Sequence, residues 1–385
     1  MRVRLDRRRH AAYFDGRDVA ARRETNEELR ELAGRGLLRL RWRAWEEDNW
    51  LEAIDLAPGR AGELYRLLRR PPREKLETLL RELLRAQQPR ADWHARFLTW
   101  AEQALSTHRR PAPLEPGDTV FNRDLLLALD AVARLSEPTL ERTLSVRLFG
   151  DSKRLKALRH AVVAVLRAHD ETAALYGGDE WALLRSHHLD RVPEYISLAG
   201  PFVLEWEDRR VDMSPFAEGV ALPATTLHTA RVAGCDARHV ITVENATSFS
   251  QLVSLRAPRV FALYTGGFAS PAVTSLLRRA RAASPQARFF HWGDLDAGGL
   301  RILAHLRASL APDVRPLAMD APTFEEHRGY AQPLTDEDRR ALIRLRAMPA
   351  LADCVELIDR LLAEGRKLEQ EAVSAHRALA PLGLE

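Results

Sequence analysis

Short apolar runs alternate with amphipathic stretches over residues 201–385. The runs read "HVITV" (239–243), "VFALY" (260–264), "ARFFHW" (287–292) and "DVRPLAM" (313–319). Continuous apolar runs of this length are typical of strands buried on both faces. Helical patterns lie between them, and one starts at Ser270 and Pro271, a suitable N-cap followed by proline at the first helical position. Strands and helices alternating at this spacing predict a parallel sheet with right-handed crossovers, hence an α/β domain.

A first block, residues 1–115, ends in a proline-rich joint. It contains a helical pattern that Gly34 and Gly36 stop, followed by two extended runs around Trp42 and Leu51. A helix followed by a hairpin is the outline of a winged helix, which commonly binds DNA but also serves as a protein contact. We expect an N-terminal arm domain with a winged-helix-like segment here, and both uses remain open.

The second block, residues 116–200, is mostly helical. Within "RLFGDSKRLKAL" (147–158), Gly150 breaks one element, and Asp151 or Ser152 is expected to cap the next. The first turns of that next helix carry three cations, Lys153, Arg154 and Lys156. We expect them to bind the DNA backbone, and a solvated helix face is the alternative.

Composition narrows the class of protein. The 385 residues are 46% hydrophobic and 29% charged, which indicates a globular chain with more than one domain. No apolar run approaches the roughly 20 residues of a membrane span, so we expect a cytoplasmic protein without a membrane partner. Cys235 and Cys354 lack the spacing of a disulfide framework or a zinc site and are expected to be buried. A net charge of +4 permits a nucleic-acid partner, although an arginine-rich chain also reflects a GC-rich genome.

Acidic residues and glycines follow the predicted strands. Glu244 comes directly after the first strand, Gly266 and Gly267 follow the second, and Asp294 and Asp296 follow the third. The carboxyl ends of parallel strands share one edge of a sheet, so these segments should converge. An isolated Asp-x-Asp before a helix is commonly a cap, but a third acid on the same edge favours a site for Mg²⁺ or Mn²⁺. The paired glycines would let a DNA phosphate approach closely.

These residues resemble a known family. A glutamate after one strand and Asp-x-Asp after a later one is the Toprim pattern of topoisomerases, primases and OLD-type nucleases. Longer strings are similar to the JetD family, the nuclease subunits of Wadjet plasmid-defence systems: "RLFGDSKRL", "TVENATSF", "YTGGFASPA", "HWGDLDAGGLRI" and "KLEQEAV". The resemblance extends over nearly the whole chain.

The resemblance implies an α/β and α+β multidomain protein related to the A subunit of topoisomerase VI. Its parts would be an arm domain (1–115), a CAP-like helical DNA-binding domain of winged-helix type (116–200) and a C-terminal Toprim domain (201–385). It further implies a homodimeric, Mg²⁺- or Mn²⁺-dependent endonuclease that cleaves closed-circular plasmid DNA. Its partners would be double-stranded DNA and the condensin-like SMC, kleisin and accessory subunits of the defence complex.

The resemblance also suggests roles for the acids. Asp294 and Asp296 match the metal ligands, and Glu244 matches the Toprim glutamate, which either binds metal or acts as general base. If the helix around Leu361 continued to residue 371, Glu371 would lie about 60° from Leu368 and nearer the apolar face than Glu369. Glu371 is therefore the expected additional catalytic acid, and an ordinary helix boundary is the alternative.

Two other functions remain open. A type IIB topoisomerase-like protein would need a tyrosine nucleophile ahead of the Toprim block, where the tyrosines are Tyr13, Tyr65, Tyr176 and Tyr195. None lies in an evident recognition helix, which favours hydrolysis by water. A non-catalytic DNA-binding scaffold is the second alternative, and the intact set of acids argues against it.

Overall fold

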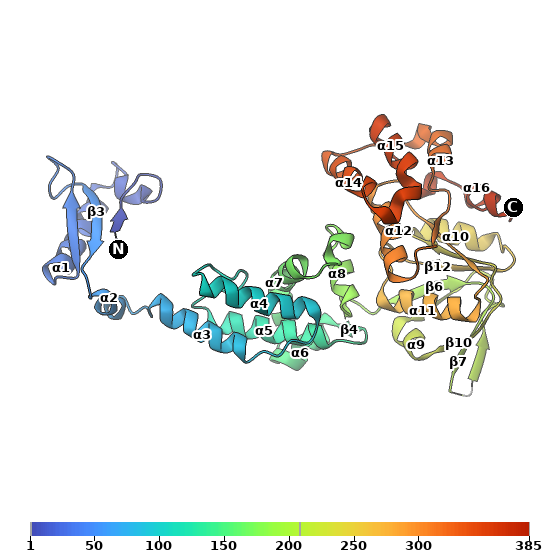
Figure 1. The fold of residues 1–385 in the computed structure, drawn as a ribbon, viewed down its shortest axis with the longest axis horizontal. Coiled ribbons are helices and arrows are strands. Elements are labelled where there is room, and N and C mark those ends of the chain that lie inside the picture. The colour runs from blue at the N-terminus through green and yellow to red at the C-terminus, as the bar shows by residue number, and fades with distance from the viewer. Residues whose placement is uncertain (1, 208, 385) are drawn as a thin grey trace. The chain divides into compact units, whose positions relative to one another are not determined.

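The chain forms two compact units in a computed structural model that describes residues 2–207 and 209–384 (Figure 1). The N-terminal unit comprises Met1–Arg85 and Glu115–Thr119, and the C-terminal unit comprises Ala86–Leu114 and Val120–Glu385. This division differs from the one suggested by the proline-rich joint, because residues 86–114 group with the C-terminal unit.

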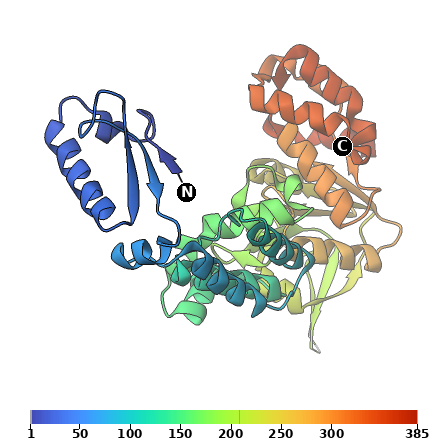
Figure 2. The ribbon, with the colours of Figure 1, turned by 60° about the vertical axis from the view of Figure 1, so that its left-hand side comes forward.

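The N-terminal unit is an α+β structure built on a small antiparallel sheet of order β1-β3-β2. Figure 2 shows helix α1 beside this sheet. The helix followed by two strands is as predicted from the sequence. The elements are β1 (Arg2–Arg4), a 3-10 turn (Ala11–Phe14), α1 (Val19–Gly34), β2 (Leu38–Trp42), β3 (Leu51–Leu56), α2 (Ala61–Leu67) and α3 (Arg73–Arg85).

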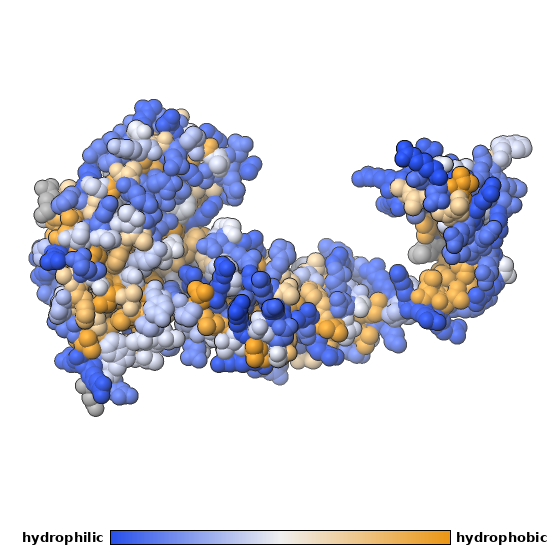
Figure 3. Space-filling model, turned by 180° about the vertical axis from the view of Figure 1, so that it is seen from behind, coloured by the Kyte–Doolittle hydropathy of each residue, from blue (hydrophilic) through white to orange (hydrophobic). Residues whose placement is uncertain are grey.

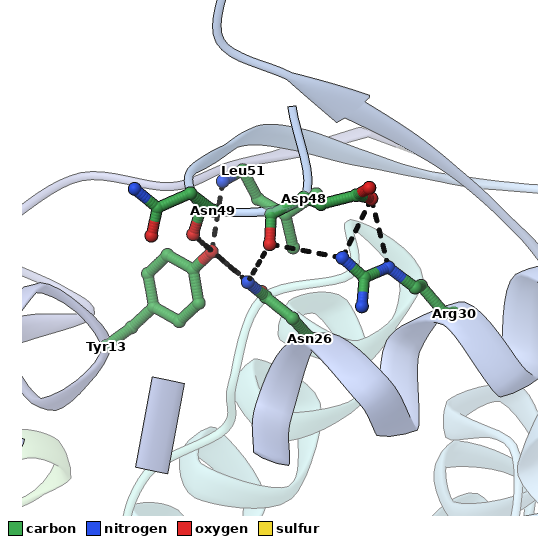
Figure 4. Close-up of polar contacts among 6 residues, drawn as sticks. All are labelled: Tyr13, Asn26, Arg30, Asp48, Asn49 and Leu51. Carbon is green, nitrogen blue, oxygen red and sulfur yellow. Dashed lines mark hydrogen bonds and ion pairs between the residues drawn. The ribbon is translucent and has the colours of Figure 1, made fainter. Parts of the chain in front are cut away.

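A buried polar network ties the hairpin to α1 (Figure 4). The Tyr13 hydroxyl donates to Asn26 Oδ1 at 2.8 Å and accepts the backbone N–H of Leu51 at 3.0 Å. Asn26 Nδ2 donates to the backbone oxygens of Asp48 at 3.2 Å and Asn49 at 3.0 Å. Asn26 is 1% exposed, so these bonds satisfy a polar side chain that would otherwise be costly to bury.

Helices make up the first part of the C-terminal unit. They are α4 (Asp92–Ser106), α5 (Thr119–Arg134), α6 (Glu141–Phe149), α7 (Arg154–His169) and α8 (Glu180–Ser186). Gly150 ends α6, as predicted, but the predicted cap of α7 is wrong. The N-cap residue is Lys153, the Asp151 carboxylate accepts the N–H of Lys153 at 2.8 Å, and Ser145 Oγ accepts the N–H of Leu155 at 3.0 Å. A serine on the preceding helix thus supplies the capping oxygen.

A six-stranded sheet of order β14-β13-β11-β12-β6-β9 organises the rest of the unit. The four strands expected from the apolar runs are all present and parallel: β11 (His239–Val243), β12 (Val260–Tyr264), β13 (Arg288–Trp292) and β14 (Arg315–Pro316). The antiparallel strands β6 (Tyr195–Ala199) and β9 (Val220–Pro223) extend it on the β12 side. The sheet therefore begins before residue 201, and its α/β, partly parallel character is confirmed.

Each parallel strand leads into a helix. These helices are α10 (Ala246–Ser254), α11 (Pro271–Ala283), α12 (Ala297–Ser309) and α13 (Ala321–Glu326). Ser270 caps α11 by accepting the N–H of Val273, with proline in the first turn, as predicted. In Figure 1 the helices α14 (Asp336–Arg346) and α15 (Val355–Glu364) gather near α12 and α13.

Smaller elements complete the C-terminal unit. The sheet β10-β7-β8 consists of β7 (Phe202–Trp206), β8 (Arg209–Asp212) and β10 (Arg231–Cys235), and α9 (Ala224–Thr229) precedes β10. The pair β4 (Thr139–Leu140) and β5 (Leu189–Asp190) is parallel, and β15 (Gln332–Pro333) pairs with β16 (Arg366–Lys367) ahead of α16 (Ala375–Leu379).

One hydrophobic core extends through the sheet-containing part, from Ile196 to Leu379. All residues of β11 are buried, which explains its continuous apolar pattern. Cys235 and Cys354 are free and buried, as expected. In the face drawn in Figure 3, hydrophilic residues cover most of the surface and hydrophobic residues form smaller patches. Among the described residues, no helix combines the length and the apolar character that a membrane span requires.

Candidate functional site

The acidic residues predicted at strand ends converge. Strands β11 and β13 pair in parallel, with Val243 opposite Trp292, so their carboxyl ends are level. The backbone N–H of Glu244 donates to the Trp292 oxygen at 3.0 Å. Glu244 Oε2 in turn accepts the backbone N–H of Asp294 at 3.2 Å. The sheet register thus places Glu244 against the segment that carries Asp294 and Asp296.

Asp296 serves as a helix cap and also belongs to this acidic group. Its Oδ1 accepts the N–H of Gly299 at 2.9 Å, which caps α12. Its Oδ2 lies 4.0 Å from the ammonium nitrogen of Lys367, which also pairs with Asp338 at 3.2 Å. The cap interpretation of Asp-x-Asp therefore holds for Asp296 while one carboxylate oxygen still faces a cation.

The C-terminal segment Lys367–Glu371 brings two more acids to the site. Oxygen atoms of Asp294, Glu369 and Glu371 all lie within 4.8 Å of one another. The prediction that the helix around Leu361 continues to Glu371 is wrong, and with it the argument that favours Glu371 over Glu369. Helix α15 ends at Glu364, and Leu368 instead forms a β-bridge with Leu295, with N–H···O distances of 2.9 and 3.2 Å.

Gln370, which the sequence analysis does not single out, connects the two strand ends to this segment. Its backbone N–H donates to Asp294 Oδ1 at 2.7 Å. Its side chain accepts the N–H of Asn245 at 2.9 Å and donates to the Trp292 oxygen at 3.0 Å. Asn245 Nδ2 also donates to Glu371 Oε1 at 2.6 Å. The only sequence signal was its position between two glutamates.

Two carboxyl groups of the site, those of Glu244 and Asp294, have raised pKa values. Burial raises the pKa of Glu244 to about 8, and the negative charges of Asp294, Asp296 and Glu369 raise it further. The hydrogen bond from the Asp294 N–H acts in the opposite direction and lowers this pKa. Burial likewise raises the pKa of Asp294 to about 7, with contributions from neighbouring carboxylates and an opposing one from the Gln370 N–H. A positive charge nearby would therefore favour the ionised form of both Glu244 and Asp294.

Gly293 makes room for the Glu244 carboxyl group. A Cβ atom at this position would lie 2.6 Å from Glu244 Oε2 and 2.7 Å from His291 Nε2. His291 is fully buried, its Nδ1 lies 3.0 Å from Thr242 Oγ1, and burial lowers its pKa to about 3. The glycine before Asp294 thus accommodates this chain's own side chains, in addition to any role toward a phosphate.

Gly266 and Gly267 lie in the loop after β12. Both have positive φ angles, of 61° and 104°, which favours glycine at each. The loop leaves the sheet beside β11, because the N–H of Thr265 donates to the Val243 oxygen at 2.9 Å. The pair is therefore on the predicted sheet edge, and phosphate contact by these glycines stays a prediction.

The predicted DNA-binding cations differ in their surroundings. Lys153 and Lys156 are exposed, whereas Arg154 is half-buried and pairs with Asp124 at 2.7 Å. Over residues 2–207 and 209–384, no hydrogen bond or ion pair joins these three to the acidic site. The structure therefore groups the acids, and DNA binding by the three cations stays a prediction.

The four tyrosines ahead of residue 201 offer little support for a covalent mechanism. Tyr13 is held in the network of the N-terminal unit, and Tyr176 is 5% exposed. Tyr195 is 62% exposed on β6, an antiparallel strand of the sheet, and Tyr65 lies on the short helix α2.

Comparisons with known proteins bear out the likeness seen in the sequence. A family model described as "Wadjet protein JetD, C-terminal" matches residues 201–381, which include all five acids of the site. A curated Wadjet protein JetD from Bacillus cereus (strain Q1) is 23% identical over 367 residues, covering 94% of this chain and 88% of the relative.

Proposed function

Since its match over residues 201–381 places the chain in the JetD family, we propose that it is a metal-dependent DNA endonuclease. One observation carries the proposal: Glu244, Asp294, Asp296, Glu369 and Glu371 gather at one edge of a parallel sheet. Carboxylates gathered this closely favour a bound cation, because their mutual repulsion opposes ionisation in its absence.

The donor set fits Mg²⁺ or Mn²⁺. All candidate ligands are carboxylate oxygens, which these hard cations prefer. Asp294 would be the central ligand, because its N–H bonds Glu244 and its carboxylate lies within 4.8 Å of those of Glu369 and Glu371. When bound, such an ion stabilises charge on a phosphoryl oxygen and makes a water molecule more acidic.

The protein's own residues would orient the reacting groups. The Asp294 N–H fixes one oxygen of Glu244, and the Gln370 N–H fixes one oxygen of Asp294. Glu244 either completes the ligand set or accepts a proton from the attacking water. Lys367, which faces Asp296, would balance part of the negative charge beside the phosphate.

Family membership supports the wider proposal. The substrate would be closed-circular plasmid DNA in the cytoplasm, and the partners would be the condensin-like SMC, kleisin and accessory subunits of a Wadjet system. A homodimer would present two sites to the two strands. In this proposal residues 201–385 act as a Toprim domain, and the preceding helices and the arm domain bind DNA or a partner protein.

The proposal is tested with the purified chain and supercoiled plasmid. Nicking or linearisation with Mg²⁺ or Mn²⁺, and none with EDTA, is the expected result. Denaturing gels should show free DNA ends, because water is the nucleophile. A protein–DNA adduct that survives denaturation would instead support a tyrosine nucleophile. Binding without cleavage, repeated with the partner subunits present, would support a scaffold.

A further inference from the structure

Gln370 is a fully buried polar residue at the centre of the acidic site. Its side chain is 0% exposed, and both ends of its amide are hydrogen bonded to backbone groups. Glutamine is rarely this buried unless its amide is satisfied, so these contacts define its position. The two backbone partners belong to Asn245 and Trp292, more than 70 residues away in the chain.

The partners of Gln370 lie next to the proposed metal ligands. Asn245 follows Glu244 at the end of β11, and the Trp292 oxygen already accepts the N–H of Glu244 at 3.0 Å. The side chain of Gln370 therefore bonds both strand ends at the point where they pair. Its backbone N–H simultaneously orients the Asp294 carboxylate at 2.7 Å.

We propose that Gln370 is a positioning residue that sets the spacing of the metal ligands. This inference rests on the proposed function. The side-chain amide holds the segment Lys367–Glu371 on the sheet edge, and this places Glu369 and Glu371 within reach of Asp294. The amide is required because one end must accept from Asn245 and the other must donate to Trp292.

Substitutions separate this role from simple packing. Gln370→Met keeps the length of the side chain but removes the acceptor and the donor. Gln370→Glu keeps the acceptor and replaces the donor with an oxygen that faces the Trp292 carbonyl. Gln286→Glu is the matched control, since Gln286 is exposed in the same unit and the added charge is the same.

The measurement is Mn²⁺ binding by titration calorimetry, with circular dichroism to confirm folding at the same temperature. Groups that orient metal ligands typically alter affinity by about 10–100-fold. Both Gln370 variants should therefore bind Mn²⁺ about 10–100-fold more weakly than wild type and Gln286→Glu. A folded Gln370→Met protein with wild-type affinity would overturn the inference.

A second measurement uses the wild-type chain and does not depend on a variant that folds. Mn²⁺ should slow hydrogen exchange in peptides covering residues 366–372, because the bound ion stabilises the ligands that Gln370 holds. Unchanged exchange in this segment, with Mn²⁺ bound, would contradict the positioning role. If wild type binds no Mn²⁺ in calorimetry, the proposed function itself fails and the inference fails with it.

Discussion

Glu244 and Asp294 lie against each other at the ends of two neighbouring parallel strands, where Oε2 of Glu244 accepts the Asp294 N–H at 3.2 Å. This hydrogen bond joins two acidic residues whose carboxylates repel each other when both are ionised. The repulsion between the ionised carboxylates is unfavourable, and a divalent cation bound between them would offset it.

The Asp294→Asn variant should lose nicking activity by about 100-fold or more, the scale of a lost catalytic group. DNA affinity should change little, because the cations of α7 are unaltered. Without metal, the melting temperature of the variant should be no lower than that of wild type, because the substitution removes a carboxylate that the neighbouring acids repel. Asp236→Asn, which alters an exposed carboxylate of the same unit, is the control. Full activity of Asp294→Asn with Mg²⁺ or Mn²⁺ would remove Asp294 from the mechanism.

The melting temperature of the metal-free protein should fall as the pH rises from about 5 to about 8. The pKa values of Asp294 and Glu244 are raised to about 7 and about 8, above the roughly 4 of an unfolded chain. The folded state thus binds more protons in this window, and that stability is lost as the pH passes through the folded pKa values. Saturating Mn²⁺ should raise the melting temperature more at pH 8 than at pH 5.5. An equal shift at both pH values would contradict this explanation.

Gly293→Ala should weaken Mn²⁺ binding and destabilise the protein by about 1–3 kcal/mol, the usual cost of overpacking. The new methyl group would lie 2.6 Å from Glu244 Oε2, and the buried His291 ring beside it has little room to move. Gly329→Ala is the control, because a Cβ atom there meets nothing within 4 Å. Calorimetry and thermal melting measure both effects, and a variant that matches the control in both would refute the packing argument.

Replacing Lys153, Arg154 and Lys156 together with Ala should flatten the slope of log affinity against log salt on duplex DNA by about two units. Each phosphate contact contributes about 0.9 to this slope. Arg154 should contribute least, because Asp124 already pairs with it. Fluorescence anisotropy over a salt series gives the slope, with Arg154→Ala alone as the comparison. An unchanged slope in the triple variant would show that Lys153, Arg154 and Lys156 form a solvated helix face and do not contact DNA phosphates.

Asn26→Ala should destabilise the N-terminal unit by about 1–3 kcal/mol, the cost of leaving buried polar partners unsatisfied. The change leaves the Tyr13 hydroxyl and the backbone oxygens of Asp48 and Asn49 without this partner (Figure 4). Asn49→Ala removes an exposed side chain and serves as the control. Hydrogen exchange of peptides from residues 11–51 reports the difference. Equal protection in the two variants would show that the network is not required.

The local sequence pattern was sufficient to predict the parallel strands and the acids that follow them. A strand buried on both faces must be apolar along its length, so β11, β12 and β13 were visible in the sequence alone. Parallel pairing then requires that their carboxyl ends meet, which places Glu244 beside Asp294 without knowledge of any side chain. The capping of α11 by Ser270 is equally local.

The remainder of the site depends on contacts that no local pattern encodes. The amphipathic run through Leu361 suggested a helix as far as Glu371, but α15 ends before Gly365 and Leu368 pairs with Leu295. The bonds of Gln370 reach residues 76 to 125 positions away. A short stretch such as "KLEQE" can adopt either a helical or an extended backbone. The free-energy difference between these two conformations is set by the hydrogen-bond partners at the edge of the folded sheet. The sequence therefore determined which parallel strands form and where their acids lie, and only the tertiary structure decided that the C-terminal segment completes the site.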